Sequence, residues 1–428
     1  MKYHAINPYY VTLIPLLLFL ITFFYPSNSW YTIFEEANVT YLSFGTLAFI
    51  LVCLLFLVFG IILGSTIKIT RAQNKIHSKL YFNLLLAPVL TVTAIVFVFY
   101  IIYLATNFPG YLLLTISGEG DLVKSMVAGG QMNYSTLPNF AIPIVWWGWY
   151  RYYSFSDKLN TILYLLRFTT LLLLIILVVN AARFALMPFI IGWFVIYTKL
   201  IVFDKTSRKN HKSRSIKFVL ILSLVILVLF SLFAIARGID NLEDLFSMIL
   251  GYGPVSFNRL GAIFHSNLTF TYSNTFVYVI PEPFFTAFRY IFSMQTISGH
   301  EVWLSEFDGI QNANLNHKYI WLTIFGYVYD SIGLFSFFYF FIYGIITGLF
   351  WIAFLKGRLI GIVMYPLTYF SIFFFFGSNY LITFFAYYLL IYALLYCWEL
   401  FIIMLIYLSK PSRHKEIIMP LKYKTAIK

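Results

Sequence analysis

The sequence predicts an all-α polytopic integral membrane protein, and three observations support this fold class. The 428 residues are 61% hydrophobic and 21% aromatic, and the mean hydropathy is +0.84. Charged residues make up 11% of the chain, whereas soluble domains contain about 25%. Apolar runs near the ~20 residues that a helix needs to cross a bilayer recur along the sequence. The composition therefore excludes an ordinary soluble domain.

The apolar runs define about ten predicted transmembrane helices, with 11 or 12 as the upper limit. They lie at approximately 9–25, 41–66, 82–105, 137–150, 159–180, 184–203, 216–236, 320–353, 359–376 and 381–408. The first run lacks the small-residue cleavage site of a signal peptide, so it is interpreted as a span. The fourth is short and depends on Trp146, Trp147 and Trp149, which are typical of a membrane interface. The eighth is too long for one upright helix, so its first part is expected to be a partly submerged approach segment.

These spans divide the chain into four regions. An N-terminal bundle of about seven spans occupies residues 1–236, and a large polar loop occupies 237–319. The C-terminal helices occupy 320–408, and a basic tail occupies 409–428. Three of the seven histidines lie in the loop, within an otherwise apolar chain. The loop is therefore the first place to look for chemistry.

The distribution of lysine and arginine predicts the orientation of the chain, because cytoplasmic segments are enriched in these residues. With the N-terminus inside, most of the 29 basic residues fall on the cytoplasmic side. The outer segments then hold Lys124, Arg183, Arg237, Arg259, Arg289 and Lys318. We therefore expect an inner-membrane protein with both termini in the cytoplasm and the 237–319 loop outside it. The basic run from Lys205 to Arg214 is interpreted as the lipid-facing flank of a span, and no nucleic-acid partner is expected.

The loop contains two contrasting patterns. Apolar residues recur at helical spacing after Pro283, and proline suits the first turn of a helix. This pattern predicts a helix over 284–292 that lies in the outer leaflet interface, with Arg289 at its polar edge. The segment Ser298–Lys318 is polar and rich in Gly and Asn, so it is expected to be an exposed loop or lid.

The strongest chemical signal is a set of four arginines on the outer side: Arg183, Arg237, Arg259 and Arg289. Placing an arginine side chain at the edge of the hydrocarbon region costs free energy, so such an arginine usually has a counterion or a functional role. A guanidinium presents a donor fork that matches phosphate oxygens. The four arginines are therefore candidate ligands of a diphosphate. The alternative is snorkelling to the interface, or pairing with Asp240, Glu243, Asp244 or Asp330.

Candidate general bases come from the same loop and its borders. The set comprises His265, His300, His317, Glu282, Glu301, Asp308 and Asp330. Histidine titrates near neutral pH, and a carboxylate can do so when burial raises its pKa. His317 and His265 are preferred, followed by Glu282 and Asp330; surface hydrogen bonding is the alternative role for each histidine. The histidine spacing matches no metal-binding pattern, so no metal and no cofactor is expected.

Two acids lie within predicted spans, where exposure of a charge to lipid is unfavourable. Asp330 lies at the outer mouth of the eighth span, so it is expected to face a cavity or to pair with an arginine. Glu399 lies deep in the last span. Since no second intramembrane charge is evident, a hydrogen bond to a neighbouring helix is favoured over an ion pathway. Cys53 and Cys397 lie in apolar runs and are interpreted as packing residues.

Four short motifs follow one another along the outer side of the chain. They are Asn180-Ala-Ala-Arg183, Ala236-Arg237-Gly238, Thr286-Ala-Phe-Arg289, and Thr-x-x-Gly-x-x-x-Asp-x-x-Gly from Thr323 to Gly333, which precedes a span containing Gly344 and Gly348. With ten to twelve spans and a large outer loop in the second half, this layout resembles the Wzy-type O-antigen polymerases, which are bacterial oligosaccharide repeat-unit polymerases. The architecture covers most of the chain, whereas the motifs cover these short stretches.

This resemblance implies a GT-C-like membrane glycosyltransferase that needs no metal. The implied donor is a glycan on undecaprenyl diphosphate, and the implied acceptor is the non-reducing-end hydroxyl of a second lipid-linked repeat unit. The outer arginines would bind the diphosphates and stabilise charge on the leaving group, while a base takes the hydroxyl proton. Membrane lipids and a chain-length regulator protein are the other implied partners.

Three alternative functions stay open at this point. An O-antigen ligase uses the same donor with a lipid A-core acceptor, and its loop chemistry is similar. A lipid-linked oligosaccharide flippase ranks lower, because it should show two related halves and polar residues inside the spans. A membrane acyltransferase needs a buried catalytic histidine near an acyl-donor channel, which the sequence does not identify.

Overall fold

A computed structural model of the chain describes residues 4–24, 33–34, 36, 40–69, 79–108, 110, 136–154, 160–179, 183–203, 242–273, 275–292, 299–316, 319 and 321–409. Every regular element within these residues is a helix, so the predicted all-α class is confirmed for the part described. The predicted span at 216–236 lies outside the described residues.

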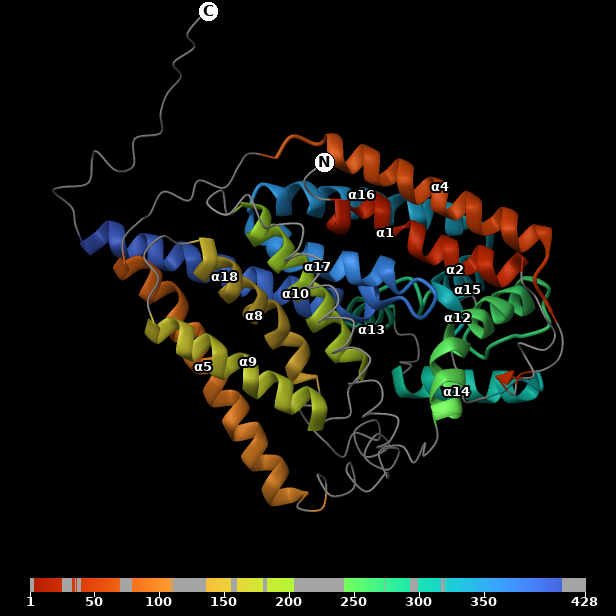
Figure 1. The fold of residues 1–428 in the computed structure, drawn as a ribbon, viewed down its shortest axis with the longest axis horizontal. Coiled ribbons are helices and arrows are strands. Elements are labelled where there is room, and N and C mark those ends of the chain that lie inside the picture. The colour runs from red at the N-terminus through yellow and green to blue at the C-terminus, as the bar shows by residue number, and fades with distance from the viewer. Residues whose placement is uncertain are drawn as a thin grey trace, which may run out of the picture.

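The helices lie side by side in an elongated bundle (Figure 1). In the N-terminal half they are η1 (His4–Ile6), α1 (Pro8–Val11), α2 (Leu13–Phe24), α4 (Phe44–Thr66), α5 (Lys79–Asn107), α8 (Leu137–Ser154), α9 (Asn160–Val179) and α10 (Arg183–Phe203). In the C-terminal half they are α12 (Leu242–Phe264), α13 (Glu282–Ile291), α14 (Gly299–Asn312), α15 (Thr323–Ile332), η3 (Gly333–Phe335), α16 (Ser336–Leu355), α17 (Leu359–Phe373) and α18 (Tyr380–Ser409).

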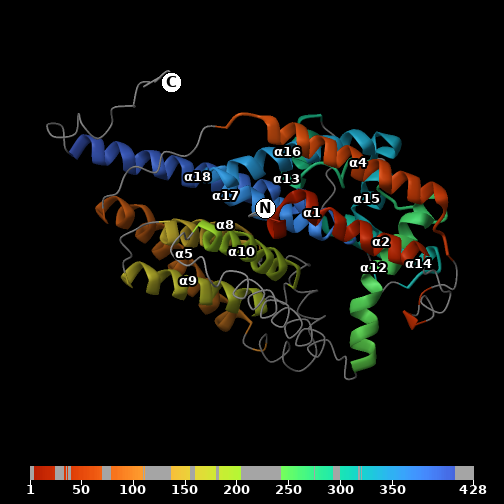
Figure 2. The ribbon, with the colours of Figure 1, turned by 45° about the horizontal axis from the view of Figure 1, so that its top comes forward.

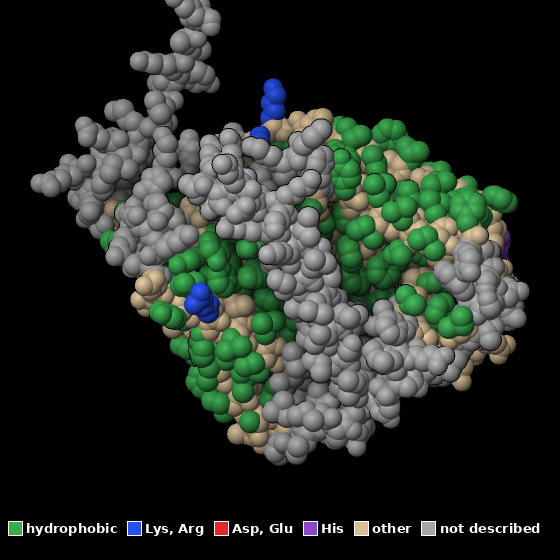
Figure 3. All heavy atoms as spheres, in the orientation of Figure 1, with side chains coloured by type: hydrophobic (Ala, Val, Ile, Leu, Met, Phe, Trp, Pro, Cys, Tyr) green, Lys and Arg blue, Asp and Glu red, His purple; other side chains and the backbone are tan. Residues whose placement is uncertain are grey.

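Five helical stretches among the described residues are long and apolar enough to cross a membrane. They are Phe44–Thr66, Leu80–Asn107, Asn160–Leu177, Thr323–Leu355 and Tyr380–Ile406. Shorter apolar helices at Pro8–Phe24, Leu186–Leu200 and Leu359–Phe373 coincide with three further predicted spans. Hydrophobic side chains cover much of the described surface in Figure 3, with few charged groups among them. This is the surface of a membrane-embedded helical protein.

Glycines on both helices form the contact between α4 and α16. Gly60 and Gly64 on α4 face Gly344 and Gly348 on α16. A Cβ atom on Gly60 would lie 2.2 Å from the carbonyl oxygen of Phe341, which is too short for a real contact. Small residues at this spacing let helix backbones approach closely in membranes. The contact joins the N-terminal and C-terminal halves of the chain.

The tryptophans predicted to mark a membrane interface on α8 are instead part of the interior. Trp146 and Trp147 are completely buried. Nε1 of Trp146 donates to the Phe189 carbonyl oxygen at 3.3 Å, and Nε1 of Trp147 donates to Glu399 at 3.1 Å. A buried indole N–H needs such an acceptor. The interface prediction is therefore wrong for these two residues, because neighbouring helices cover them.

The long eighth apolar run is divided into two helices, α15 and α16. Gly333 follows α15 with a φ of +57°, a left-handed conformation that favours glycine. Phe325 on α15 stacks on Phe340 on α16, with ring centroids 5.1 Å apart. Residues so distant along one straight helix could not touch. α15 therefore folds back against α16.

The region between α12 and α15 contains one confirmed and one wrong prediction. α13 forms where the pattern after Pro283 predicts a helix. The 298–318 segment, predicted as an exposed loop or lid, instead forms α14 over most of its length. Val302, Glu306 and Ile310 recur every four residues along α14, and all three are buried. This buried face explains why a polar sequence forms a helix here.

Three helices of the C-terminal half gather at one end of the molecule. α12, α14 and α15 lie at the right of Figure 1, close to the end of α2 and the start of α4. The turned view in Figure 2 shows the same grouping. This end of the molecule holds two buried polar clusters.

Candidate functional site

Five polar side chains meet where α14, α15 and the segment between α12 and α13 come together. They are Ser273 and Tyr278 from that segment, Glu306 from α14, and Tyr327 and Asp330 from α15, and we call them the acid cluster. Glu306 lies on the buried face of α14. Tyr327 and Asp330 are three residues apart on α15, so they share one face of that helix.

A glycine lets the segment before α13 cross α14 closely. A Cβ atom on Gly309 would lie 2.7 Å from the ring of Phe270 and 2.9 Å from the carbonyl oxygen of Thr269. Backbone and ring therefore occupy the space that any other residue would fill. This close crossing brings Ser273 and Tyr278 next to the acids of α14 and α15.

The two carboxylate oxygens of Asp330 have different surroundings. Oδ1 accepts a hydrogen bond from the Ser273 hydroxyl at 2.5 Å. Oδ2 is buried and has no hydrogen-bond partner in the described part of the chain. The side chain is thus held by one oxygen and keeps free lone pairs on the other. The described residues therefore supply a hydrogen-bond donor to Oδ1 alone.

Glu306 is the second acid of the cluster. The Tyr327 hydroxyl donates to its Oε2 at 3.3 Å, and the Tyr278 ring centroid lies 4.8 Å from that of Tyr327. Burial raises the pKa of Glu306 to about 8; the phenols of Tyr278 and Tyr327 oppose this rise, and the charge of Asp330 adds to it. Burial also raises the pKa of Tyr278, with Glu306 and Asp330 adding to the shift. Glu306 is therefore mainly a neutral acid at pH 7.

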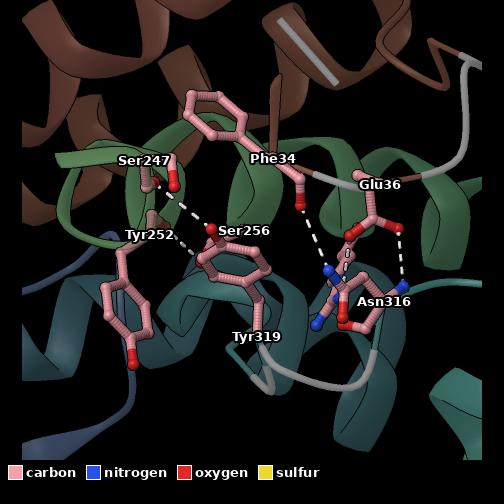
Figure 4. Close-up of polar contacts among 8 residues, drawn as sticks. Phe34, Glu36, Ser247, Tyr252, Ser256, Asn316 and Tyr319 are labelled. Carbon is pink, nitrogen blue, oxygen red and sulfur yellow. Dashed lines mark hydrogen bonds and ion pairs between the residues drawn. The ribbon is translucent and has the colours of Figure 1, made fainter. Parts of the chain in front are cut away.

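Glu36, Arg259 and Asn316 form a second buried cluster, which we call the arginine clasp. Nη2 of Arg259 donates to Oε2 of Glu36 at 2.9 Å and to the carbonyl oxygen of Asn316. The backbone N–H of Asn316 donates to Oε1 of Glu36 at 3.1 Å, and its side-chain amide donates to the Phe34 carbonyl oxygen at 3.1 Å. Figure 4 shows Glu36, Phe34 and Asn316 converging from different segments of the chain.

The clasp buries opposite charges together. The side chains of Arg259 and Glu36 are completely buried. Burial lowers the pKa of Arg259, and the charge of Glu36 opposes that change. Beside the clasp, the Tyr319 hydroxyl donates to the Ser247 carbonyl oxygen at 3.2 Å, as Figure 4 also shows. These contacts tie the 34–36 segment and the 316–319 segment to α12.

Arg259, a predicted diphosphate ligand, lies in this completely buried pair. Its Nη2 is engaged by Glu36 and Asn316, whereas its Nε and Nη1 are buried without a hydrogen-bond partner among the described residues. The alternative prediction was that Arg259 pairs with an acid. It does so, but the acid is Glu36 rather than Asp240, Glu243, Asp244 or Asp330. Glu36 lies between the first two predicted spans, and no pattern in the sequence indicates which arginine it meets.

Arg289 lies half-buried in the last turn of α13. Its guanidinium carbon is 5.3 Å from the centroid of the Phe285 ring, the buried anchor of the helix. Phe284, Phe288 and Ile291 follow one another at helical spacing on α13 and are exposed. An amphipathic helix that exposes such a stripe resembles a helix lying in a membrane interface.

The other predicted residues lie elsewhere or outside the description. His265 ends α12 on the exposed surface, and its Nε2 lies 3.0 Å from Oγ of Ser43, which caps α4. Its described contacts are therefore with α4 rather than with the acid cluster. Glu282 and Arg183 begin α13 and α10, and their side chains lie outside the described residues. Arg237 and His317 lie entirely outside them.

Two acids of the clusters, Glu306 and Glu36, were missed by the sequence analysis. Glu306 lies four residues from Val302 and four from Ile310, so a helical reading of the 298–318 segment would have placed it on an apolar face. Glu36 has no comparable signal, because it lies in a short segment between two spans. Glu301 and Asp308, which were weighed as bases, are exposed on α14.

A further ion pair lies away from both clusters. Arg151 on α8 pairs with Glu399 on α18, which also accepts the Trp147 hydrogen bond at 3.1 Å. The predicted link from Glu399 to a neighbouring helix is confirmed, although the sequence analysis found no charged partner. Cys53 is buried, whereas Cys397 is exposed and so is not a packing residue as predicted. No three metal-ligating side chains come together within the described residues.

Comparisons of the chain with protein-family models, curated proteins and solved structures give no match.

Proposed function

We propose that this chain is a membrane glycosyltransferase that joins oligosaccharide repeat units carried on undecaprenyl diphosphate at the periplasmic face of the inner membrane. The observation that carries the proposal is the state of Asp330. It lies in an outer motif, is held by Ser273 through one oxygen, and keeps the other oxygen free of hydrogen bonds. A general base for a sugar hydroxyl needs this combination of fixed geometry and available lone pairs.

The proposed step transfers a glycan from one lipid to another. The acceptor hydroxyl oxygen attacks the anomeric carbon of the donor, and the bond from that carbon to the diphosphate oxygen breaks. Undecaprenyl diphosphate leaves with the bonding electrons, and the hydroxyl proton passes to Oδ2 of Asp330. Arg289, with Arg183 and Arg237, stabilises the diphosphate as negative charge develops on it. Arg259 has a structural role in this proposal.

The membrane setting supports the choice of substrate. The donor and acceptor are lipids, so they reach the site from the bilayer rather than from water. α13 exposes an apolar stripe of Phe284, Phe288 and Ile291 while holding Arg289 at its edge. This arrangement suits a cation that meets a lipid diphosphate at the membrane surface. The acid cluster supplies the proton acceptor at the end of the bundle where α12, α14 and α15 gather.

Deletion of the gene followed by glycan analysis tests the reaction. The proposal expects loss of long chains while single repeat units remain attached to lipid A-core. Polymer that accumulates on the carrier lipid without attachment would identify a ligase instead. Lipid-linked units trapped on the cytoplasmic side would identify a flippase. Either of these two results overturns the proposal.

Variants expressed in the deletion strain test the residues. Asp330→Asn keeps the shape of the side chain but removes its basicity, so we expect a loss of about 100-fold or more in chain elongation. Arg289→Ala and Arg183→Ala should abolish polymer while the protein level holds. Gln311→Asn, on the exposed face of α14, is the control and should leave polymer unchanged. Long chains from Asp330→Asn would remove Asp330 as the base, and long chains from both arginine variants would remove the diphosphate assignment.

A further inference from the structure

The acid cluster buries two carboxyl groups, and the charge of Asp330 acts on Glu306. Glu306 is 6% exposed and Asp330 is 9% exposed. Their hydrogen-bond partners in the described residues are the hydroxyls of Tyr327 and Ser273, and neither acid forms an ion pair there. Two negative charges buried near each other without compensation are strongly disfavoured. Such a pair retains a proton that isolated carboxylates would release.

We propose that Glu306 and Asp330 hold one proton between them at neutral pH, that Glu306 carries it, and that Glu306 thereby acts as the positioning residue that keeps Asp330 ionised. The catalytic part of this inference rests on the proposed function, whereas the shared proton does not. When two neighbouring carboxyl groups have different environments, one stays protonated and the other stays ionised.

The surroundings of each acid decide which one is protonated. The Ser273 hydroxyl donates to Asp330, and such a donor stabilises a carboxylate. Glu306 is the more deeply buried acid, which favours its neutral form. The titratable groups that act on Glu306 are Tyr278, Tyr327 and Asp330. The pKa of Glu306, raised to about 8, agrees with a proton that stays in place at pH 7.

The retained proton has a consequence for the substrate. With Glu306 neutral, the cluster carries one negative charge, and this charge is on the group that must accept the hydroxyl proton. When Glu306 ionises, the cluster carries two negative charges close to the site that a lipid diphosphate must approach. Repulsion then weakens binding of the anionic substrate. We therefore expect kcat/KM to fall about tenfold per pH unit above a pH of about 8, as for a single ionisation.

Infrared difference spectroscopy of the purified full-length protein tests the proton directly. The wild-type minus Glu306→Gln spectrum should show the band of a protonated carboxyl group at pH 7, and the band should disappear with a midpoint near pH 8. Absence of this band at pH 7 overturns the inference. Asp330→Asn should lower the midpoint, because it removes the charge that disfavours ionisation of Glu306. An unchanged midpoint in Asp330→Asn would show that the two acids share no proton.

Activity with lipid-linked repeat units tests the catalytic part. The fall in kcat/KM above pH 8 should be absent in Glu306→Gln, whereas Gln311→Asn should keep the wild-type pH profile. A purely structural Glu306 would leave the shape of the pH profile unchanged, which would overturn its positioning role. If Glu306→Gln does not fold, Tyr327→Phe replaces it: the loss of its hydroxyl should move the infrared midpoint to higher pH. A titrating band in a protein without polymerase activity would refute the proposed function and leave the shared proton standing.

Discussion

The arginine clasp and the acid cluster are two buried polar sites at the same end of the molecule. They differ in the charges that they bury. The clasp pairs Arg259 with Glu36, so two opposite charges are buried together. The acid cluster buries Glu306 beside Asp330, so two like charges must be kept from forming at once. Both sites connect a short segment to a helix of the C-terminal half.

This difference separates a structural role from a chemical one. Opposite charges that are buried together compensate each other, and removing one partner alone is destabilising. Burying two like charges together does not stabilise the folded protein, so stability does not explain why both acids are there. Perturbed acids with a free oxygen are more often found where protons are transferred. In the proposed function Arg259 therefore has a structural role, and Glu306 joins Asp330 as a candidate for proton chemistry.

The largest expected effect concerns the clasp. Arg259→Met leaves Glu36 buried without its partner, and we expect the free energy of unfolding to fall by about 3–5 kcal/mol. The double variant Arg259→Met with Glu36→Leu should recover most of this loss, because no uncompensated charge remains. Thermal unfolding in detergent measures both. A single variant that unfolds at the wild-type temperature would show that the clasp is dispensable and would break the comparison.

The next effect is the pH dependence of stability that Glu306 produces. Its pKa is about 8 in the folded protein and near 4.5 in the unfolded chain. Between these values the unfolded chain releases the proton and the folded protein keeps it. The free energy of unfolding should therefore fall by about 1.4 kcal/mol for each unit that the pH rises within this window.

Glu306→Gln isolates this contribution, because glutamine does not titrate. The difference in unfolding free energy between wild type and Glu306→Gln should be constant below pH 4.5 and should grow in favour of the variant up to pH 8. Chemical unfolding at several pH values gives the two curves. Parallel curves of unfolding free energy against pH throughout this range would mean that folding does not raise the pKa of Glu306. The acid cluster would then not differ from the clasp in the way described.

The smallest effect is that of a single hydrogen bond within the acid cluster. Tyr327→Phe removes the hydroxyl that donates to Glu306 and keeps the ring, so we expect a loss of about 1 kcal/mol in unfolding free energy. Tyr329→Phe, on the same helix and packed against Phe49 by its ring, is the matched control and should change stability little. Equal stabilities for the two variants would show that the Tyr327 hydroxyl does not hold Glu306.

The sequence was most informative where local pattern decides the structure. The helix after Pro283 and the apolar class of the whole chain follow from spacing and composition. The excess length of the eighth apolar run was also visible, although the break at Gly333 was not predicted. Asp330 was a candidate base from its motif alone. α14 escaped prediction because its Gly- and Asn-rich composition hides a buried face of Val302, Glu306 and Ile310.

Contacts between distant segments could not be predicted in the same way. Nothing in one sequence says that Arg259 meets Glu36, which is 223 positions away. The same limit applies to Arg151 and Glu399, 248 positions apart. Side-chain geometry also decides function within a motif: the Thr323–Gly333 stretch contains Asp330, but only the fold reveals that one of its oxygens is held and the other is free.

The glycine contact between α4 and α16 makes the proposed chemistry depend on a part of the chain that takes no part in it. α15, which carries Asp330, stacks through Phe325 on Phe340 of α16, and α16 is seated on α4 through Gly60, Gly64, Gly344 and Gly348. The backbone of α4 therefore supports the position of the Asp330 carboxylate through α16 and α15. A methyl group added at Gly60 would clash with the α16 backbone, and the resulting shift of α16 would displace α15 and, with it, Asp330.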